Sequence, residues 1–225
     1  MSFTRQSALR RKYEQIEREL VDIEERGLLR SPKLLAGPPG PRVCIDGRDV
    51  LLLCSNDYLG LSNHPAVKQA AQRAIEEFGA GAGASRLVAG RLPVHDTLEQ
   101  AIARLKRTED AVVFGSGYLA NIGAITALCG AGDTIYSDRL NHASIIDACR
   151  LSRAKLKIFP HRDTDMLRRM LENCSCDGRR LIITDGVFSM DGDIAPLPEL
   201  AELAEEFDGY LMVDDAHATG VIGKN

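Results

Sequence analysis

Tryptophan is absent from the 225 residues, and aromatic residues make up only 5% of them. Aliphatic side chains must therefore supply most of the core, and a hydrophobic content of 44% is sufficient for a large one. No apolar run approaches the length of a membrane span, and the charged N-terminal stretch has no apolar leader segment. We therefore expect a cytoplasmic protein with no membrane segment.

An excess of one charge is also missing. Acidic and basic residues are interspersed, and the formal net charge is -4. Proteins that bind the phosphate backbone of nucleic acids concentrate Lys and Arg on one face, and no such stripe is visible. The sequence therefore predicts no nucleic-acid partner.

Paired cysteine spacings are the third absence. The six cysteines show neither a disulfide framework nor a zinc-binding pattern, and most lie in apolar segments. We expect them to be reduced packing residues. Cys174 and Cys176 form the closest pair, and without a second pair or a nearby histidine a polar loop is favoured over a metal site.

The first part of the chain predicts an arm. Apolar residues recur every three or four positions over 4–27, which is typical of an amphipathic helix. After a connector rich in Gly and Pro, two short runs at 42–45 and 50–54 flank Asp46-Gly47. This pattern predicts a β-hairpin.

The rest of the chain alternates between helical patterns and short apolar runs. The predicted strands are 111–114, 134–136, 155–159, 181–184 and 210–213. The predicted helices are 93–106, 119–129, 144–151, 165–171 and 198–207. We therefore divide the chain into an arm at 1–60 and an α/β domain at 61–225, with a mostly parallel sheet flanked by helices. Ligands of such sheets bind beyond the carboxyl ends of the strands.

Small residues follow the first of these predicted strands. Ser116, Gly117 and Tyr118 lead directly into a helix, and the backbone amides at a helix start can bind an anion. The turn lacks the lysine of a nucleotide-triphosphate loop and most of the dinucleotide glycine pattern. Taken alone, it fits either a phosphate site or an ordinary tight turn.

Acidic residues and a histidine follow the last predicted strand. Asp214, Asp215 and His217 lie where that strand reaches the ligand-binding edge. A carboxylate buried there needs a cation or strong donors, and the protonated nitrogen of a pyridine ring is such a cation. The motif alone is equally compatible with a helix cap or a metal site.

Two more loops bring polar residues to the same edge. The loop at 138–144 contains His142, and the loop at 185–193 contains Ser189. A lone His142 is most often a residue of a helix start, but an imidazole can also lie over a planar ring. Four consecutive polar loops at one edge favour a binding site over a coincidence of turns.

Taken in order, these segments resemble the α-oxoamine synthases, which use pyridoxal phosphate (PLP) and have the aspartate-aminotransferase fold, type I of the PLP-dependent transferases. The resemblance covers nearly the whole chain. It also rests on three further stretches, namely 55–61, 81–90 and 213–217. The resemblance implies PLP as the cofactor and a C-terminal small domain that follows the large one.

The resemblance also implies a role for each candidate site residue. Ser116, Gly117 and Tyr118 would cradle the cofactor and its phosphate. His142, the candidate catalytic residue within the chain, would stack on the ring and contact the substrate, and Asp214 would pair with the ring nitrogen. Ser189 and His217 would bond the phenolic oxygen.

Two residues of the arm would bind the substrates. Asn56 would hold the carboxylate of the amino acid, and Arg30 would meet the acidic end of the acyl group. For Arg30 a solvated basic residue beside a helix end is an equally good interpretation.

Within the family, 85–90 and 116–121 are most similar to members that join L-alanine to a pimeloyl thioester in biotin biosynthesis. The resemblance implies a homodimer with the active site at its interface. Members that use glycine and acetyl-CoA are the alternative. Two further alternatives are a non-catalytic partner subunit and a module that binds phosphate metabolites.

The lysine that forms the Schiff base in this family is expected beyond Asn225. Lys224 does not lie in the Ser/Thr-x-Ser-Lys stretch of the family, and the other lysines, including Lys106, are expected away from the site. The resemblance thus implies a fragment that lacks the small domain and is inactive alone.

Overall fold

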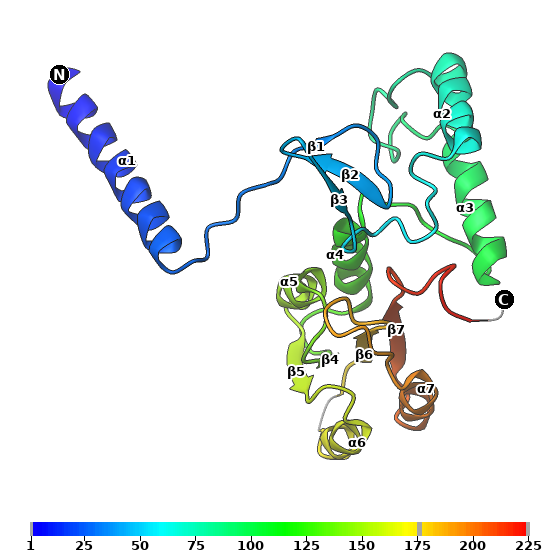
Figure 1. The fold of residues 1–225 in the computed structure, drawn as a ribbon. Coiled ribbons are helices and arrows are strands. Elements are labelled where there is room, and N and C mark those ends of the chain that lie inside the picture. Colours follow the sequence, from blue (N-terminus) through cyan, green and yellow to red (C-terminus); the bar gives the residue numbers. More distant parts are fainter. Residues whose placement is uncertain (1, 175–176, 224–225) are drawn as a thin grey trace. The chain divides into compact units, whose positions relative to one another are not determined.

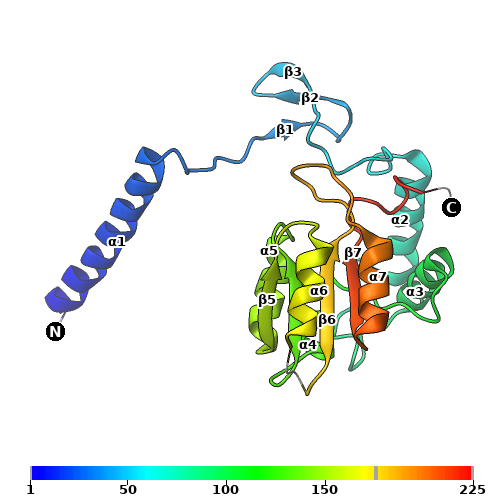
Figure 2. The same cartoon turned by 90° about the horizontal axis from the view of Figure 1, so that it is seen from below.

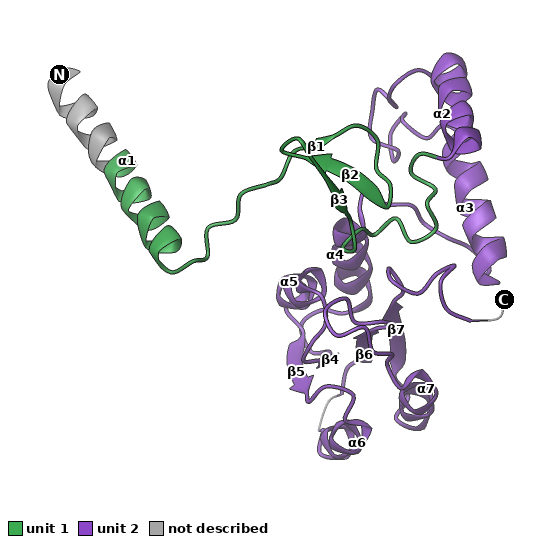
Figure 3. Cartoon of the chain, in the orientation of Figure 1, with its two compact units in different colours: residues 1–63 green, residues 64–225 purple. Residues whose placement is uncertain are grey.

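The computed structural model describes residues 2–174 and 177–223, and the side chains of the first helix from residue 12 onward. The chain forms two compact units, Met1–Asn63 and His64–Asn225 (Figure 3). The predicted roles of an arm at 1–60 and a cofactor domain at 61–225 stay predictions, because compactness does not define a role.

The first unit contains one helix and a small antiparallel sheet (Figure 1). Its elements are α1 (Ser2–Glu25), β1 (Leu35–Ala36), β2 (Arg42–Ile45) and β3 (Arg48–Leu51), with the strand order β1-β2-β3. The predicted hairpin is confirmed, but its second strand begins two residues earlier than expected. Asp46 and Gly47 both have positive φ, so these two residues complete a tight turn and pairing resumes at Arg48.

The second unit is built around a parallel sheet. Its strands are β4 (Thr134–Asp138), β5 (Lys155–Phe159), β6 (Arg180–Asp185) and β7 (Tyr210–Asp214), in the order β5-β4-β6-β7. Its helices are α2 (Pro65–Phe78), α3 (Pro93–Lys106), α4 (Gly117–Leu128), α5 (Ala143–Ser152), α6 (Thr164–Glu172) and α7 (Leu197–Glu206). All strand pairs in this sheet are parallel.

Helices cover both faces of the sheet. Figure 2 shows α6 and α7 side by side on one face, where Leu167 and Leu200 pack on Ile182. On the other face Ile125 of α4 packs near Ile183. Successive side chains of β6 therefore pack into the two cores on opposite faces of the sheet. Burial of each of these aliphatic side chains contributes about 1.5 to 3 kcal/mol to the free energy of unfolding.

The predicted strand at 111–114 is wrong, because the structure has no strand there. The backbone NH of Val113 donates to Glu99 Oε1 at 3.1 Å, and its carbonyl accepts from the guanidinium of Arg86. Val112 is 69% exposed. The run therefore bonds to side chains instead of a neighbouring strand.

Two smaller expectations also need comment. Cys129 and Cys149 are buried as predicted, but Cys54 is exposed and is not a packing residue. Cys176 lies outside the described residues, so the polar loop predicted around it stays a prediction. Within 2–174 and 177–223, no helix combines the length and apolarity needed to cross a membrane.

Candidate functional site

The carboxyl edge of the parallel sheet carries the candidate site. The strands β4, β6 and β7 end in Asp138, Asp185 and Asp214. Asp138 is 1% exposed and Asp185 is 5% exposed, while Asp214 is half-buried. Carboxylates are costly to bury, so the groups that face each of them determine what the edge can bind.

Asp214 is held by two donors. Asn121 Nδ2 donates to Asp214 Oδ2 at 2.8 Å, and the backbone NH of Ala216 donates to Asp214 Oδ1 at 3.1 Å. Asn121 lies buried on α4 and donates also to Ser144 Oγ at 2.9 Å. The carboxylate at the end of β7 is therefore fixed in direction by α4 and still half-open to a ligand.

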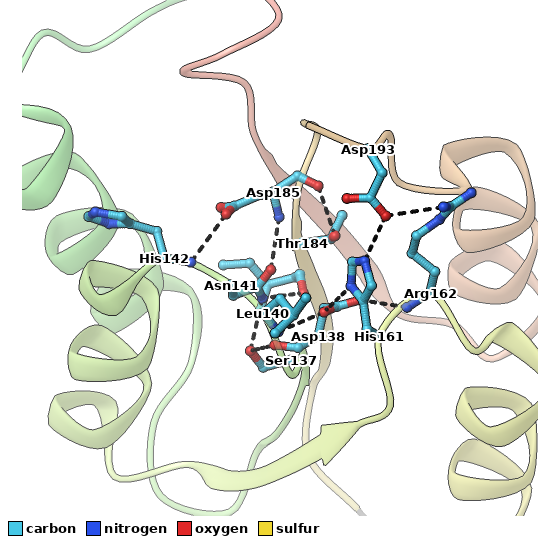
Figure 4. Close-up of polar contacts among 11 residues, drawn as sticks. Ser137, Asp138, Leu140, Asn141, His142, His161, Arg162, Thr184, Asp185 and Asp193 are labelled. Atoms are coloured by element: carbon cyan, nitrogen blue, oxygen red, sulfur yellow. Dashed lines mark hydrogen bonds and ion pairs between the residues drawn. The ribbon is translucent and has the colours of Figure 1, made fainter. Parts of the chain in front are cut away.

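His142 begins α5 and is linked to the same network. Its Nδ1 accepts from the backbone NH of Ser144 at 3.3 Å and lies 2.7 Å from Ser144 Oγ. Ser144 Oγ in turn accepts from Asn121, so His142 and Asp214 are joined through two intermediate side chains. Figure 4 shows that the imidazole of His142 extends away from Asp185, while the backbone of His142 faces it.

Asp185 is the least satisfied of the three acids. Its Oδ2 accepts from the backbone NH of His142 at 3.2 Å, and its Oδ1 has no partner among the described residues. Burial and the neighbouring charge of Asp214 raise the pKa of Asp185 to about 6. This part of the edge is therefore rich in negative charge and short of donors, which suits a cationic or proton-bearing ligand.

The start of α4 has the geometry of an anion site. Ser116 is the N-cap, and its Oγ accepts from Leu119 N at 3.2 Å. A Cβ placed on Gly117 would meet no atom within 4 Å, so there is open space beside this helix start, where the first backbone amides can bind an anion. The Tyr118 hydroxyl donates to Asp147 Oδ2 at 2.7 Å, and this bond raises the pKa of Tyr118.

The remaining candidates of the second unit lie in loops at this edge. Ser189 is exposed in the loop between β6 and α7, and His217 is half-buried in the turn after β7. In the first unit, Arg30 and Asn56 are both exposed. The roles predicted for these four residues stay predictions, and Lys224 lies outside the described residues.

The expectation that Lys106 lies away from the site is wrong. Lys106 ends α3, and its Nζ contacts Asp215 Oδ2 and donates to Thr219 Oγ1 at 2.7 Å. Burial opposes the charge on Asp215, but the bonds from Lys106 and Thr219 outweigh it and lower the pKa of Asp215. Lys106 thus anchors the turn that follows Asp214.

Sequence reasoning missed a second group of residues at the edge. His161 follows β5 and lies between Asp138 and Asp193, with each ring nitrogen within hydrogen-bond distance of one carboxylate. The rule that ligands meet the carboxyl ends of parallel strands would have singled out His161, because it comes two residues after the last residue of β5. In the described ranges, no cluster of three His, Cys, Asp or Glu side chains has the arrangement of a metal site.

Comparison with known proteins identifies the family. The model of the family described as "Aminotransferase class I and II" matches residues 48–225. The chain belongs to this family. The predicted α/β fold of the aspartate-aminotransferase type is thereby confirmed, together with the parallel sheet and its flanking helices.

Named relatives of this aminotransferase-family chain are close in sequence. The 8-amino-7-oxononanoate synthase of Geotalea daltonii is 58% identical over 92% of the chain and 53% of its own length. That of Lysinibacillus sphaericus is 51% identical over 94% of the chain and 54% of its own length. The chain thus spans about half the length of the curated relatives it matches.

Solved structures of the family have the same fold. A lysine-to-alanine variant of serine palmitoyltransferase from S. paucimobilis, with a bound PLP-myriocin aldimine, has a TM-score of 0.81 at 32% identity, over 90% of this chain and 51% of that one. The 8-amino-7-oxononanoate synthase of Francisella tularensis has a TM-score of 0.58 at 30% identity, over 71% and 43%.

Proposed function

We propose that the whole protein is an 8-amino-7-oxononanoate synthase. In this reaction L-alanine condenses with a pimeloyl thioester of coenzyme A or acyl carrier protein, releasing carbon dioxide and the free thiol, in biotin biosynthesis. Curated relatives that carry this name are 51 to 58% identical to the chain. The proposal extends to the whole protein because the chain spans about half of those relatives.

The observation that carries the proposal is the carboxylate of Asp214. It is directed by Asn121 and lies beside Asp185, whose buried Oδ1 has no partner among the described residues. A pyridinium nitrogen at Asp214 would supply the positive charge that this edge lacks, so the residues fit PLP. When bound, PLP supplies an electron sink that stabilises negative charge at the α-carbon of the amino acid.

The other candidates complete a site for this cofactor. The backbone amides of Gly117 and Tyr118 at the start of α4, with the dipole of that helix, would hold the phosphate. His142 would lie over the ring, and Ser189 with His217 would donate to the phenolic oxygen. Neutral donors at that oxygen and an acid at the nitrogen together favour electron withdrawal from the substrate.

The substrate and assembly proposals are carried by the family resemblance. Asn56 would hold the carboxylate of L-alanine, and Arg30 would meet the acidic end of the pimeloyl group. The protein would act as a homodimer in the cytoplasm.

A spectroscopic experiment tests the proposed function. The full-length gene product is purified with PLP, and its visible spectrum is recorded with L-alanine, with glycine, and then with pimeloyl-CoA. We expect a bound-cofactor band that responds to L-alanine in preference to glycine, and an amino-ketone product from pimeloyl-CoA. A response to glycine with acetyl-CoA would favour a 2-amino-3-ketobutyrate ligase instead, and absence of a band would favour a non-catalytic partner subunit.

A substitution at Asp214 tests the role of this residue. Asp214→Asn keeps the size of the side chain but cannot hold a proton on the ring nitrogen, so kcat should fall roughly a hundredfold or more. Asp208→Asn is the matched control, since Asp208 is exposed and its positive φ suits asparagine. Equal kcat values in both variants would contradict the role given to Asp214.

A further inference from the structure

The loop between β6 and α7 is folded on itself. The backbone NH of Phe188 donates to the carbonyl of Asp193 at 3.0 Å, and that of Gly192 donates to the carbonyl of Phe188 at 2.8 Å. Val187 and Ile194 form an antiparallel bridge at its base. The loop therefore has a defined shape, and its tip carries the exposed Ser189.

His161 connects this loop to the rest of the sheet edge. Its Nδ1 lies 2.9 Å from Asp138 Oδ1, and its Nε2 lies 2.8 Å from Asp193 Oδ2. A neutral imidazole carries one NH, so both ring nitrogens can donate to the two carboxylates only when the ring is doubly protonated. Figure 4 shows the ring between the two carboxylates, and this geometry indicates an imidazolium.

Further contacts make this arrangement rigid. The backbone NH of Arg162 donates to Asp138 Oδ2 at 2.9 Å, and its side chain donates to Asp193 Oδ2 at 3.1 Å. Phe188 is 2% exposed, and its ring meets the His161 ring edge-on at 4.4 Å between centroids. The ends of β4 and β5 therefore hold the loop at both Asp193 and Phe188.

We infer that His161 is a positioning residue that locks the loop in the shape in which Ser189 reaches the cofactor. This inference rests on the proposed function, because it assigns Ser189 to the PLP site. His161 itself would not touch the cofactor. It would act through Asp193, four residues after Ser189 in the same loop.

The charges around His161 agree with this role. Burial opposes protonation of the ring, but the bonds to Asp138 and Asp193 outweigh it and raise the pKa of His161. The charged groups that face the ring are Asp138 from the end of β4, Asp193 from the loop, and the neighbouring Arg162. The bond from His161, and after it the bond from Arg162, lower the pKa of Asp193 against the opposing effect of burial.

Hydrogen exchange of the PLP-free full-length protein tests the lock directly. In His161→Gln and in Asp193→Asn, the amides of Phe188 and Gly192 should exchange roughly tenfold faster or more, while those of β6 are unchanged. Asp191→Asn is the matched control, because it removes the same charge from an exposed position of the same loop. Unchanged exchange in both test variants would overturn the lock.

A double-mutant cycle tests whether the lock serves the cofactor. Ser189→Ala should change the PLP spectrum and weaken PLP binding several-fold in the wild-type background, and should have little further effect in His161→Gln. A merely structural role for His161 would leave the full effect of Ser189→Ala in place, which would overturn the inference. Absence of PLP binding by the wild type would overturn the proposed function. The hydrogen-exchange experiment would then still test whether His161 holds the loop.

Discussion

The three aspartates that end β4, β6 and β7 differ in the donors that face them. Asp138 accepts from Leu140 N, from His161 and from Arg162 N, whereas Asp214 accepts from Asn121 and Ala216 N. Among the described residues, the Asp185 side chain accepts a hydrogen bond from His142 N alone. The side chain with the fewest donors is also the one whose pKa is raised to about 6.

Asp185 should make the stability of the PLP-free protein depend on pH. Because its pKa is higher in the folded chain than in the unfolded one, folding takes up a proton between about pH 4 and 6. Stability should therefore fall as pH rises through this window and stay lower above it. Asp185→Asn removes the charge, so its free energy of unfolding should exceed that of the wild type by about 2 kcal/mol at about pH 7.

Urea unfolding at about pH 7 and about pH 4.5 measures this effect. The gain from Asp185→Asn should shrink at the lower pH, where the wild-type carboxyl is largely protonated. Asp208→Asn, at an exposed position, should show neither change. An equal gain in the free energy of unfolding at both pH values would contradict the idea that a buried negative charge at Asp185 destabilises the protein.

His161 should also make stability fall as pH rises, but in a higher pH window than Asp185. Its pKa is raised in the folded protein, so the stabilisation it gives the loop is complete below its ordinary value near 6.5 and is lost as pH rises through the folded pKa. Protection of the Phe188 and Gly192 amides, corrected for intrinsic exchange, should therefore decrease toward alkaline pH. In His161→Gln the decrease should be absent, and its persistence there would assign it to another group.

Most elements of the second unit could be predicted from sequence pattern. The helix at 93–106 and the strand at 155–159 have the bounds that the pattern predicts. The run at 111–114 has the composition of a strand, yet its backbone bonds to Glu99 and Arg86, and composition does not reveal a missing neighbour.

The site was predictable where it depends on topology alone. The parallel strand β7 brings Asp214 to the carboxyl edge, where Asn121 of α4 donates to it. The helix start at Ser116 was predicted from its small-residue turn, although the run at 111–114 before it forms no strand in the structure. The contact of Lys106 with Asp215 joins residues 109 positions apart, and only tertiary packing creates it. No local pattern could have revealed that contact.

The start of α4 should serve both stability and phosphate binding. Ser116→Ala removes the N-cap bond to Leu119 N and should cost about 1 kcal/mol of unfolding free energy. Because the cap also orients the open amides at Gly117, PLP affinity should fall several-fold as well. Thermal unfolding and fluorescence titration with PLP measure the two effects.

The N-cap of α6 provides the matched control for this variant. Asp163 Oδ1 accepts from Met166 N at 2.8 Å, so Asp163→Ala should cost a similar amount of stability. PLP affinity should be unchanged in Asp163→Ala, because α6 contributes no residue to the proposed site. A similar loss of affinity in both variants would mean that the effect of Ser116→Ala is general destabilisation.

At the scale of the whole molecule, the second unit has two hydrophobic cores on opposite faces of one parallel sheet. One core lies under α6 and α7 and the other under α4 and α5, and the shared sheet joins them. The proposed PLP ligands come from the starts of α4 and α5, the end of β7 and two loops, so they join the sheet to the helices on one of its faces. A ligand that bonds to all of them couples these elements to one another.

PLP should therefore stabilise the second unit cooperatively. A ligand at one hundred times its Kd adds about 2.7 kcal/mol to the free energy of unfolding when it binds only the folded state. Since Asn121 connects α4 with Ser144 of α5 and with Asp214 of β7, amide exchange should slow in all three elements together.

Hydrogen-exchange mass spectrometry with PLP, and with inorganic phosphate as the comparison, measures this slowing of exchange. Phosphate alone should protect mainly the amides at the start of α4. If PLP also protected only those amides, the PLP ring would not reach Asp214.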